Sequence, residues 1–109
     1  MTDHTFNTTK WAEMDMLNQM GNISSEVGRA LSAKRQGKLD RCQSAFYRGL
    51  DLIDETARLW AIQKQAGLKE LLYARELFAE SVTTDKVDST LETYFMQFAI
   101  AARRGSEQR

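Results

Sequence analysis

The chain has 109 residues, of which 42% are hydrophobic, and its fifteen basic and fifteen acidic side chains cancel to a net charge of zero. This balance argues against attraction to nucleic acid or to an anionic membrane, and the apolar content excludes a disordered chain. With no proline and only six glycines, the composition predicts an all-α protein built from long helices. We expect a disordered tail over residues 1–8, a single helical bundle domain over residues 9–105 and a frayed tail over residues 106–109.

The first predicted helix extends from Lys10 to about Gln36, with Thr9 as its N-cap. Gly37 follows the basic end of this helix and terminates it, because glycine adopts the left-handed conformation at little cost. Apolar residues recur at intervals of three and four, which indicates one buried face. This face consists of Leu17, Met20, Ile23, Val27, Ala30 and Leu31.

The second predicted helix extends from about Lys38 to Gln65 and has the clearest apolar periodicity in the chain. Because the connection at Gly37 and Lys38 is so short, the first two helices are expected to form an antiparallel hairpin. The predicted buried stripe consists of Leu39, Cys42, Phe46, Leu50, Ile53, Ala57 and Trp60.

Two shorter helices are expected to follow. A break at Ala66 and Gly67 precedes a third helix over residues 68–82, and Ser89 and Glu92 have the spacing of a capping box at the start of a fourth. The third helix is expected to bury Leu68, Leu71, Leu72, Phe78 and Val82. The four elements predict an antiparallel four-helix bundle with two long helices and two shorter ones.

The last predicted helix contains a segment, residues 94–102, in which Gln97 is the only polar side chain. Apolar side chains therefore point in every direction around the helix, and a chain of this size cannot cover them all by itself. This predicts a homodimer or a protein partner that covers the segment. The expected anchors of the interaction are Tyr94, Phe95, Phe98, Ile100 and Trp60, with Tyr73 beside them.

A run of small residues lies on the first helix, at Gly21, Ser24, Ser25 and Gly28. Their spacing of three and four lets a second helix approach closely, so we interpret the run as a packing notch. The alternative is a recognition site, in which the neighbouring Glu26 and Arg29 contact a partner.

Few residues are available for catalysis. The single His4 and the single Cys42 cannot build a nucleophile and base pair, and Cys42 is expected to be a buried thiol in a reducing cytoplasm. Asp51, Asp54 and Glu55 are interpreted as a solvated helix flank, paired with arginines such as Arg48 and Arg58. We therefore expect no enzyme, no metal and no cofactor. The absence of a long apolar run or a signal core predicts a cytoplasmic protein that does not enter the membrane.

Three resemblances accompany these patterns. Residues 26–51 resemble one tetratricopeptide hairpin, without a second copy at the period of about 34 residues that such repeats have. The segments Asn-Ile-Ser-Ser-Glu-Val-Gly-Arg-Ala (22–30) and Tyr-Phe-x-Gln-Phe-Ala-x-Ala-Ala-Arg (94–103) resemble small bacterial all-α proteins of uncharacterised function, which implies a bacterial or mobile-element origin and no particular reaction. The whole is also similar to HEPN-type bundles, but it lacks their catalytic arginine and histidine motif, since His4 precedes the helices.

The sequence thus predicts a non-enzymatic helical module for protein–protein interaction, which regulates or inhibits a partner. One alternative is a substrate-binding or antitoxin-like subunit of a nucleotidyltransferase system, which would bind nucleotide or RNA through arginines. A second alternative is a small accessory protein of a mobile element.

Overall fold

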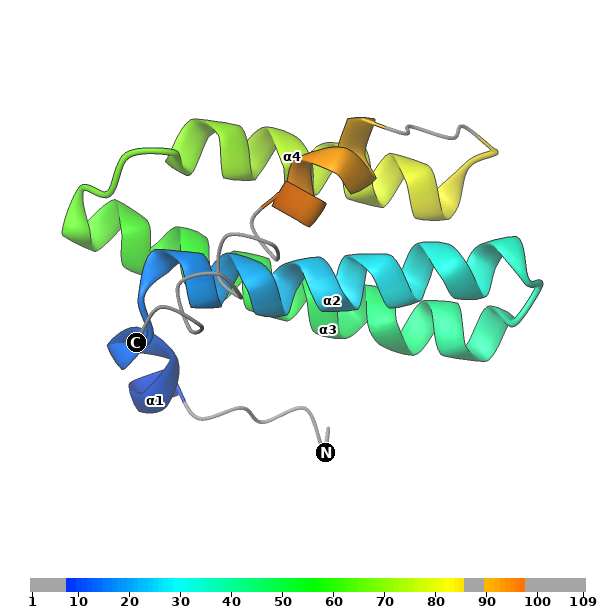
Figure 1. The fold of residues 1–109 in the computed structure, drawn as a ribbon, viewed down its shortest axis with the longest axis horizontal. Helices are drawn as coiled ribbons and strands as arrows, with labels where there is room; N and C mark the ends of the chain where they lie inside the picture. Colours follow the sequence, from blue (N-terminus) through cyan, green and yellow to red (C-terminus); the bar gives the residue numbers. More distant parts are fainter. Residues whose placement is uncertain (1–7, 86–89, 98–109) are drawn as a thin grey trace.

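The computed structural model describes residues 8–85 and 90–97, and this part of the chain is all-α. Four helices are bounded as α1 (Thr8–Glu13), α2 (Met16–Arg35), α3 (Leu39–Gln63) and α4 (Leu68–Thr83), and residues 90–97 form a further helical stretch. Figure 1 shows α2 and α3 side by side, with α4 lying along them. The predicted all-α class is confirmed, with five helical segments in place of the expected four.

The prediction of one uninterrupted helix over residues 10–36 is wrong, because the helix is interrupted between the end of α1 at Glu13 and the start of α2 at Met16. Asp15 has extended backbone angles and caps α2, since its carboxylate accepts a hydrogen bond of 2.8 Å from the amide of Asn18. Thr9 is therefore an internal residue of α1 and not an N-cap. The apolar periodicity continues through the break, which is why periodicity alone does not reveal it.

Helix α1 is held against the bundle by a buried polar network. The indole of Trp11 donates to the hydroxyl of Thr56 at 2.9 Å, and the carbonyl of Trp11 accepts from the amide of Gln19 at 3.0 Å. The same Gln19 accepts a hydrogen bond of 3.0 Å from the indole of Trp60 on α3. One glutamine therefore links three helices. The two contacts give both polar atoms of the buried Gln19 amide a hydrogen-bond partner.

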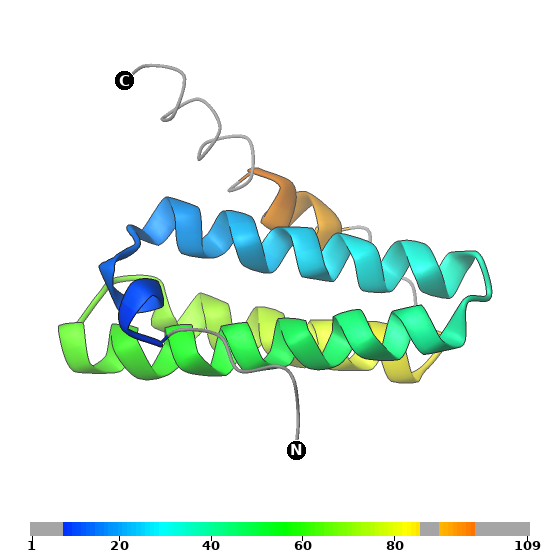
Figure 2. The same cartoon turned by 90° about the horizontal axis from the view of Figure 1, so that it is seen from below.

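The turns on both sides of α3 follow the predicted breaks. Gly37 has a φ of +73°, and the amide of Lys38 bonds the carbonyl of Ala33 across the turn. Gly67 has a φ of +100° directly before α4. Both positions need the left-handed region that glycine enters most easily. The predicted hairpin of the first two long helices is visible in Figure 2, where α2 and α3 run past each other from the tight turn.

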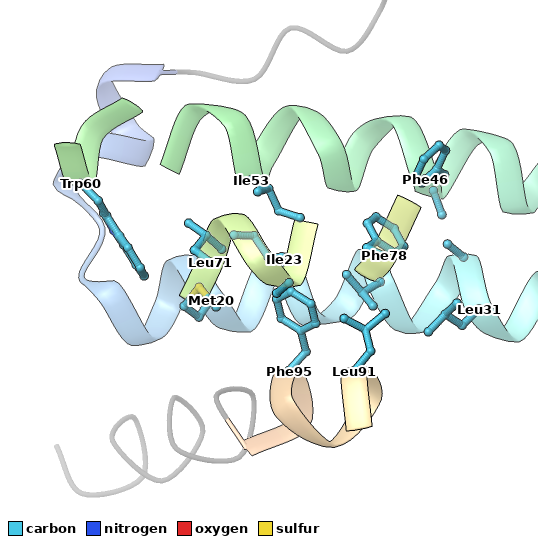
Figure 3. Close-up of a cluster of buried hydrophobic side chains, with 14 of the residues drawn as sticks. Met20, Ile23, Leu31, Phe46, Ile53, Trp60, Leu71, Phe78, Leu91 and Phe95 are labelled. Carbon is cyan, nitrogen blue, oxygen red and sulfur yellow. The ribbon is translucent and has the colours of Figure 1, made fainter. Parts of the chain in front are cut away.

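The core lies between α2, α3, α4 and the 90–97 stretch. Figure 3 shows this cluster, in which the rings of Phe46 and Phe78 meet edge to face at 5.1 Å between centroids. The largest fully buried side chains are Phe78, Phe95, Met20, Ile23, Ile53, Leu71 and Leu91.

Two residues of the predicted stripes are exposed. Leu39 is 73% exposed, because it is the first residue of α3 and lies at the hairpin end. Leu72 is exposed as well, since the buried face of α4 is centred on Leu71, Ala74 and Phe78. Leu17 is half-buried.

Residues 90–97 pack against α2. Leu91 and Phe95 point into the core (Figure 3), and Glu92 forms an ion pair of 2.8 Å with Arg35. The predicted cap at Ser89 and the predicted helix end near Gly105 lie outside the described residues. No described helix combines the length and the apolar character needed to cross a membrane.

Candidate binding groove between α2 and α3

A groove with a volume of about 670 Å³ lies along α2 and α3, and residues of both helices line it. Gly28 and Ala33 from α2 and Ala45 from α3 contribute small side chains to its lining. Positions three and four apart on each helix face the groove, so the two long helices supply two parallel walls.

Four cationic side chains line the groove: Arg29, Lys38, Arg41 and Arg48. Asp40 is the only acidic residue in the lining that the structure describes. Lys38 and Arg41 are exposed, and within residues 8–85 and 90–97 their side chains form no hydrogen bond or ion pair. The groove is therefore a concentrated positive region on a chain whose total charge is zero.

Glu26 holds two of these arginines in place. Its carboxylate is only 10% exposed and accepts from the Nη1 atom of Arg29 at 2.9 Å and from the Nε atom of Arg48 at 2.8 Å. Each carboxylate oxygen thus has its own guanidinium partner, which offsets the cost of burying the charge. Since Arg48 reaches Glu26 through one nitrogen, its outer Nη atoms remain available to a ligand.

The sequence prediction of Glu26 and Arg29 as a pair is only part of this arrangement. Arg48 was expected to pair with carboxylates of its own helix, but it bonds Glu26, which lies 22 positions earlier. No local pattern signals this contact, because the register of α2 against α3 determines it. Lys38 and Arg41 were not singled out, although their place beside the Gly37 turn puts them at the end of the hairpin.

The predicted aromatic anchors lie elsewhere. Trp60 is 2% exposed and Phe95 is 1% exposed, so both belong to the core of the chain and offer no surface to a partner. This corrects their interpretation as interface residues. Tyr94 is half-buried against the core, and Phe98 and Ile100 lie outside the described residues. Tyr73 is exposed on α4.

The small-residue notch on α2 divides into two parts. The hydroxyl of Ser24 lies 2.6 Å from the carbonyl oxygen of Phe95, which supports the interpretation of close helix packing at that position. At Gly28, by contrast, an added β-carbon would meet no heavy atom of the described residues within 4 Å. Gly28 lines the α2–α3 groove and also a smaller hollow that α2 forms with Phe95 and Met96.

Two of the carboxylates that were interpreted as a solvated helix flank, Asp54 and Glu55, form separate ion pairs. Asp54 accepts from Arg75 at 2.6 Å, and this hydrogen bond raises the pKa of Arg75. Glu55 pairs with Arg58 one helical turn away, as the solvated-flank interpretation expects. No group of three His, Cys, Asp or Glu residues within the described ranges is arranged to hold a metal ion.

Comparison of the chain with family models, with curated proteins and with solved structures gave no match.

Proposed function

We propose that this protein is a non-enzymatic helical interaction module, which binds an acidic segment of a partner protein in the α2–α3 groove. The observation that supports this proposal is the set of four cations, from α2, the hairpin turn and α3, around a lining that contains one carboxylate. Two of these cations have no intramolecular partner in the part of the chain described here, so binding does not require an existing ion pair to break.

The dimensions of the groove favour a short segment. Its α2 wall extends from Gly28 to Gln36, roughly 12 Å at the helical rise, which matches about four residues of an extended chain. A nucleic acid that makes roughly 6 to 10 phosphate contacts needs a longer basic surface than this groove offers. We therefore favour an acidic protein segment over the alternative of RNA binding in a nucleotidyltransferase system.

The experiment is a fluorescence anisotropy titration with a labelled peptide of alternating glutamate and glycine. The test variant carries Lys38→Gln and Arg41→Gln, and the matched control carries Lys64→Gln and Lys69→Gln, two exposed lysines that do not line the groove. We expect the test variant to bind about tenfold more weakly, and the control to lose little, because only the first pair contacts the ligand.

Three outcomes would contradict the proposal. The first is equal weakening by both pairs of substitutions, which would indicate a nonspecific charge effect. The second is no binding of the acidic peptide at millimolar concentration. The third is tighter binding of a labelled oligonucleotide of equal charge, which would favour the nucleotide or RNA alternative.

The homodimer is a separate part of the proposal. It rests on the apolar character of residues 94–102, in which Phe95 is buried in the core of the chain itself and Met96 is exposed. Residues 98–102 lie outside the described part of the chain. We expect light scattering to give the mass of two chains at micromolar concentration. The mass of one chain would remove the homodimer and leave groove binding unaffected.

A further inference from the structure

We propose that the groove recognises a phosphate monoester, and that the acidic segment it binds is anchored by a phosphorylated side chain at the hairpin end. This inference rests on the proposed function and names the ligand chemistry of the same site. Three features of the groove support it: its charge balance, its free donor groups and its place beside the start of α3.

The charge of the groove matches a doubly charged ligand. Arg29, Lys38, Arg41 and Arg48 supply four positive charges, while Glu26 and Asp40 supply two negative ones, which leaves an excess of two. A phosphate monoester carries about −1.5 to −2 charges near neutral pH, whereas a carboxylate carries one. One phosphoryl group therefore neutralises the site, and a single carboxylate leaves it half compensated.

The donor groups are arranged for several oxygens at once. Arg48 bonds Glu26 through Nε, and Arg29 bonds it through Nη1, so the remaining guanidinium donors have no acceptor within the described ranges. The contact with Glu26 restrains both guanidinium groups before any ligand arrives. Arginine forks that are held in this way suit the oxygens of a phosphoryl group, which accept more charge-assisted hydrogen bonds than a carboxylate does.

The start of α3 adds to the positive potential of the hairpin end. Lys38 is the N-cap residue, and its side chain forms no capping hydrogen bond. The amide of Cys42 is the first to bond within α3, so the preceding amides of the first turn remain donors without a helical acceptor. Lys38 and Arg41 line the groove beside this positive end of a 25-residue helix. The helix end reinforces a site that the four cations already define.

The test compares three labelled peptides that differ only in their central residue, which is phosphoserine, glutamate or serine, in the same acidic background. We expect the phosphoserine peptide to bind about tenfold more tightly than the glutamate peptide, since it adds charge and an acceptor oxygen. Arg41→Gln should reduce this ratio to about twofold, because it removes one of the charges that contact the phosphoryl group. Arg41 has no partner within residues 8–85 and 90–97, so the substitution should leave the fold intact. Lys69→Gln is the control and should leave the ratio unchanged.

A steric variant provides an independent measurement. Gly28→Leu adds a side chain at a lining position where a β-carbon meets no heavy atom of the described residues within 4 Å, so we expect it to obstruct the groove and leave the fold intact. We expect it to weaken binding of all three peptides, while circular dichroism and the melting temperature show an intact helical domain.

The outcomes separate this inference from the proposed function. Equal affinity for the phosphoserine and glutamate peptides would overturn the inference and leave acidic-segment binding in place. No binding of any of the peptides would overturn both. A competition experiment compares unlabelled phosphoserine peptide with inorganic phosphate as displacers of the labelled phosphoserine peptide. Displacement by both at the same concentration would overturn the assignment to a protein segment, because a free ion would then satisfy the site.

Discussion

The backbone of Gly49 on α3 faces the ring of Phe78 on α4. A β-carbon at position 49 would lie 2.9 Å from the Cε2 atom and 3.3 Å from the Cζ atom of that ring. Phe78 is fully buried and packs against Phe46, so its ring has little room to move. The absence of a side chain at position 49 thus leaves the space that the Phe78 ring of α4 occupies against α3.

This contact predicts opposite effects of the same substitution at two helical glycines. Gly49→Ala should lower the free energy of unfolding by about 1–3 kcal/mol, because it overpacks the core. Gly28→Ala should raise it by about 0.5–1 kcal/mol, because alanine loses less backbone entropy in a helix and meets no atom there. Urea unfolding of both variants measures the difference. If both proteins became more stable, the approach of α4 to Gly49 would be looser than described.

The core position of Phe46 predicts a large loss of stability on truncation. Phe46→Ala removes a buried ring that meets Phe78 edge to face, and it should cost about 3–5 kcal/mol. Gln43→Ala, one turn earlier on the exposed side of α3, should change stability by less than about 0.5 kcal/mol. Equal midpoints in urea for the two variants would show that the facing of α3 is incorrect.

The hydrogen bond from the Trp60 indole to Gln19 predicts a loss of stability when the indole is left unpaired. Gln19→Leu removes the acceptor of the buried Trp60 indole, whereas the Trp11 carbonyl keeps a second bond from the amide of Met14. The expected loss is roughly 1–3 kcal/mol for the one orphaned donor. Gln63→Leu is the matched control at an exposed position of α3. Unchanged stability in Gln19→Leu would mean that the indole finds another acceptor.

Ser24 predicts a local effect on the 90–97 stretch. Ser24→Ala removes the hydroxyl that lies 2.6 Å from the Phe95 carbonyl, at a cost of about 1 kcal/mol. Amide hydrogen exchange should become faster in residues 91–97 and stay unchanged in α3. Ser25→Ala serves as the control, because within residues 8–85 and 90–97 that hydroxyl bonds only the Gly21 carbonyl of its own helix. Faster exchange in both variants, or in neither, would argue against an anchoring role of Ser24.

Tyr94 predicts a decline of stability in alkaline solution. Burial, with a smaller contribution from Glu70, raises the pKa of its phenol above the ordinary value of 10.0. The folded chain therefore retains this proton at a pH where the unfolded chain has lost it, so stability is present below that pH and is lost as the pH rises through the folded pKa. Urea unfolding between about pH 9 and pH 11 should show a steeper decline for the native chain than for Tyr94→Phe. Parallel curves would remove Tyr94 as the cause.

The sequence by itself determined the elements whose signals are local. The all-α class follows from composition. The limits of α3 and the start of α4 follow from apolar periodicity that is interrupted at Gly37 and Gly67, where the backbone has positive φ angles that glycine adopts readily. The break before α2 also had a local signal in the capping residue Asp15, but the apolar period continues across it. Periodicity therefore predicted one helix over a range in which the N-cap at Asp15 separates α1 from α2.

Only the tertiary structure decided which distant residues meet. The pairing of Glu26 with Arg48 and the contact of Gly49 with Phe78 depend on how α2, α3 and α4 slide and rotate against one another as the core packs. The burial of Trp60 and Phe95 depends on the same packing, which assigns their aromatic surface to the chain itself. The groove also depends on this packing. Once the apolar faces of α2 and α3 are buried in the core, the remaining faces bring the cations of the lining together. Residue spacing specifies a face on each helix, but the summed packing of all the helices specifies which faces come together.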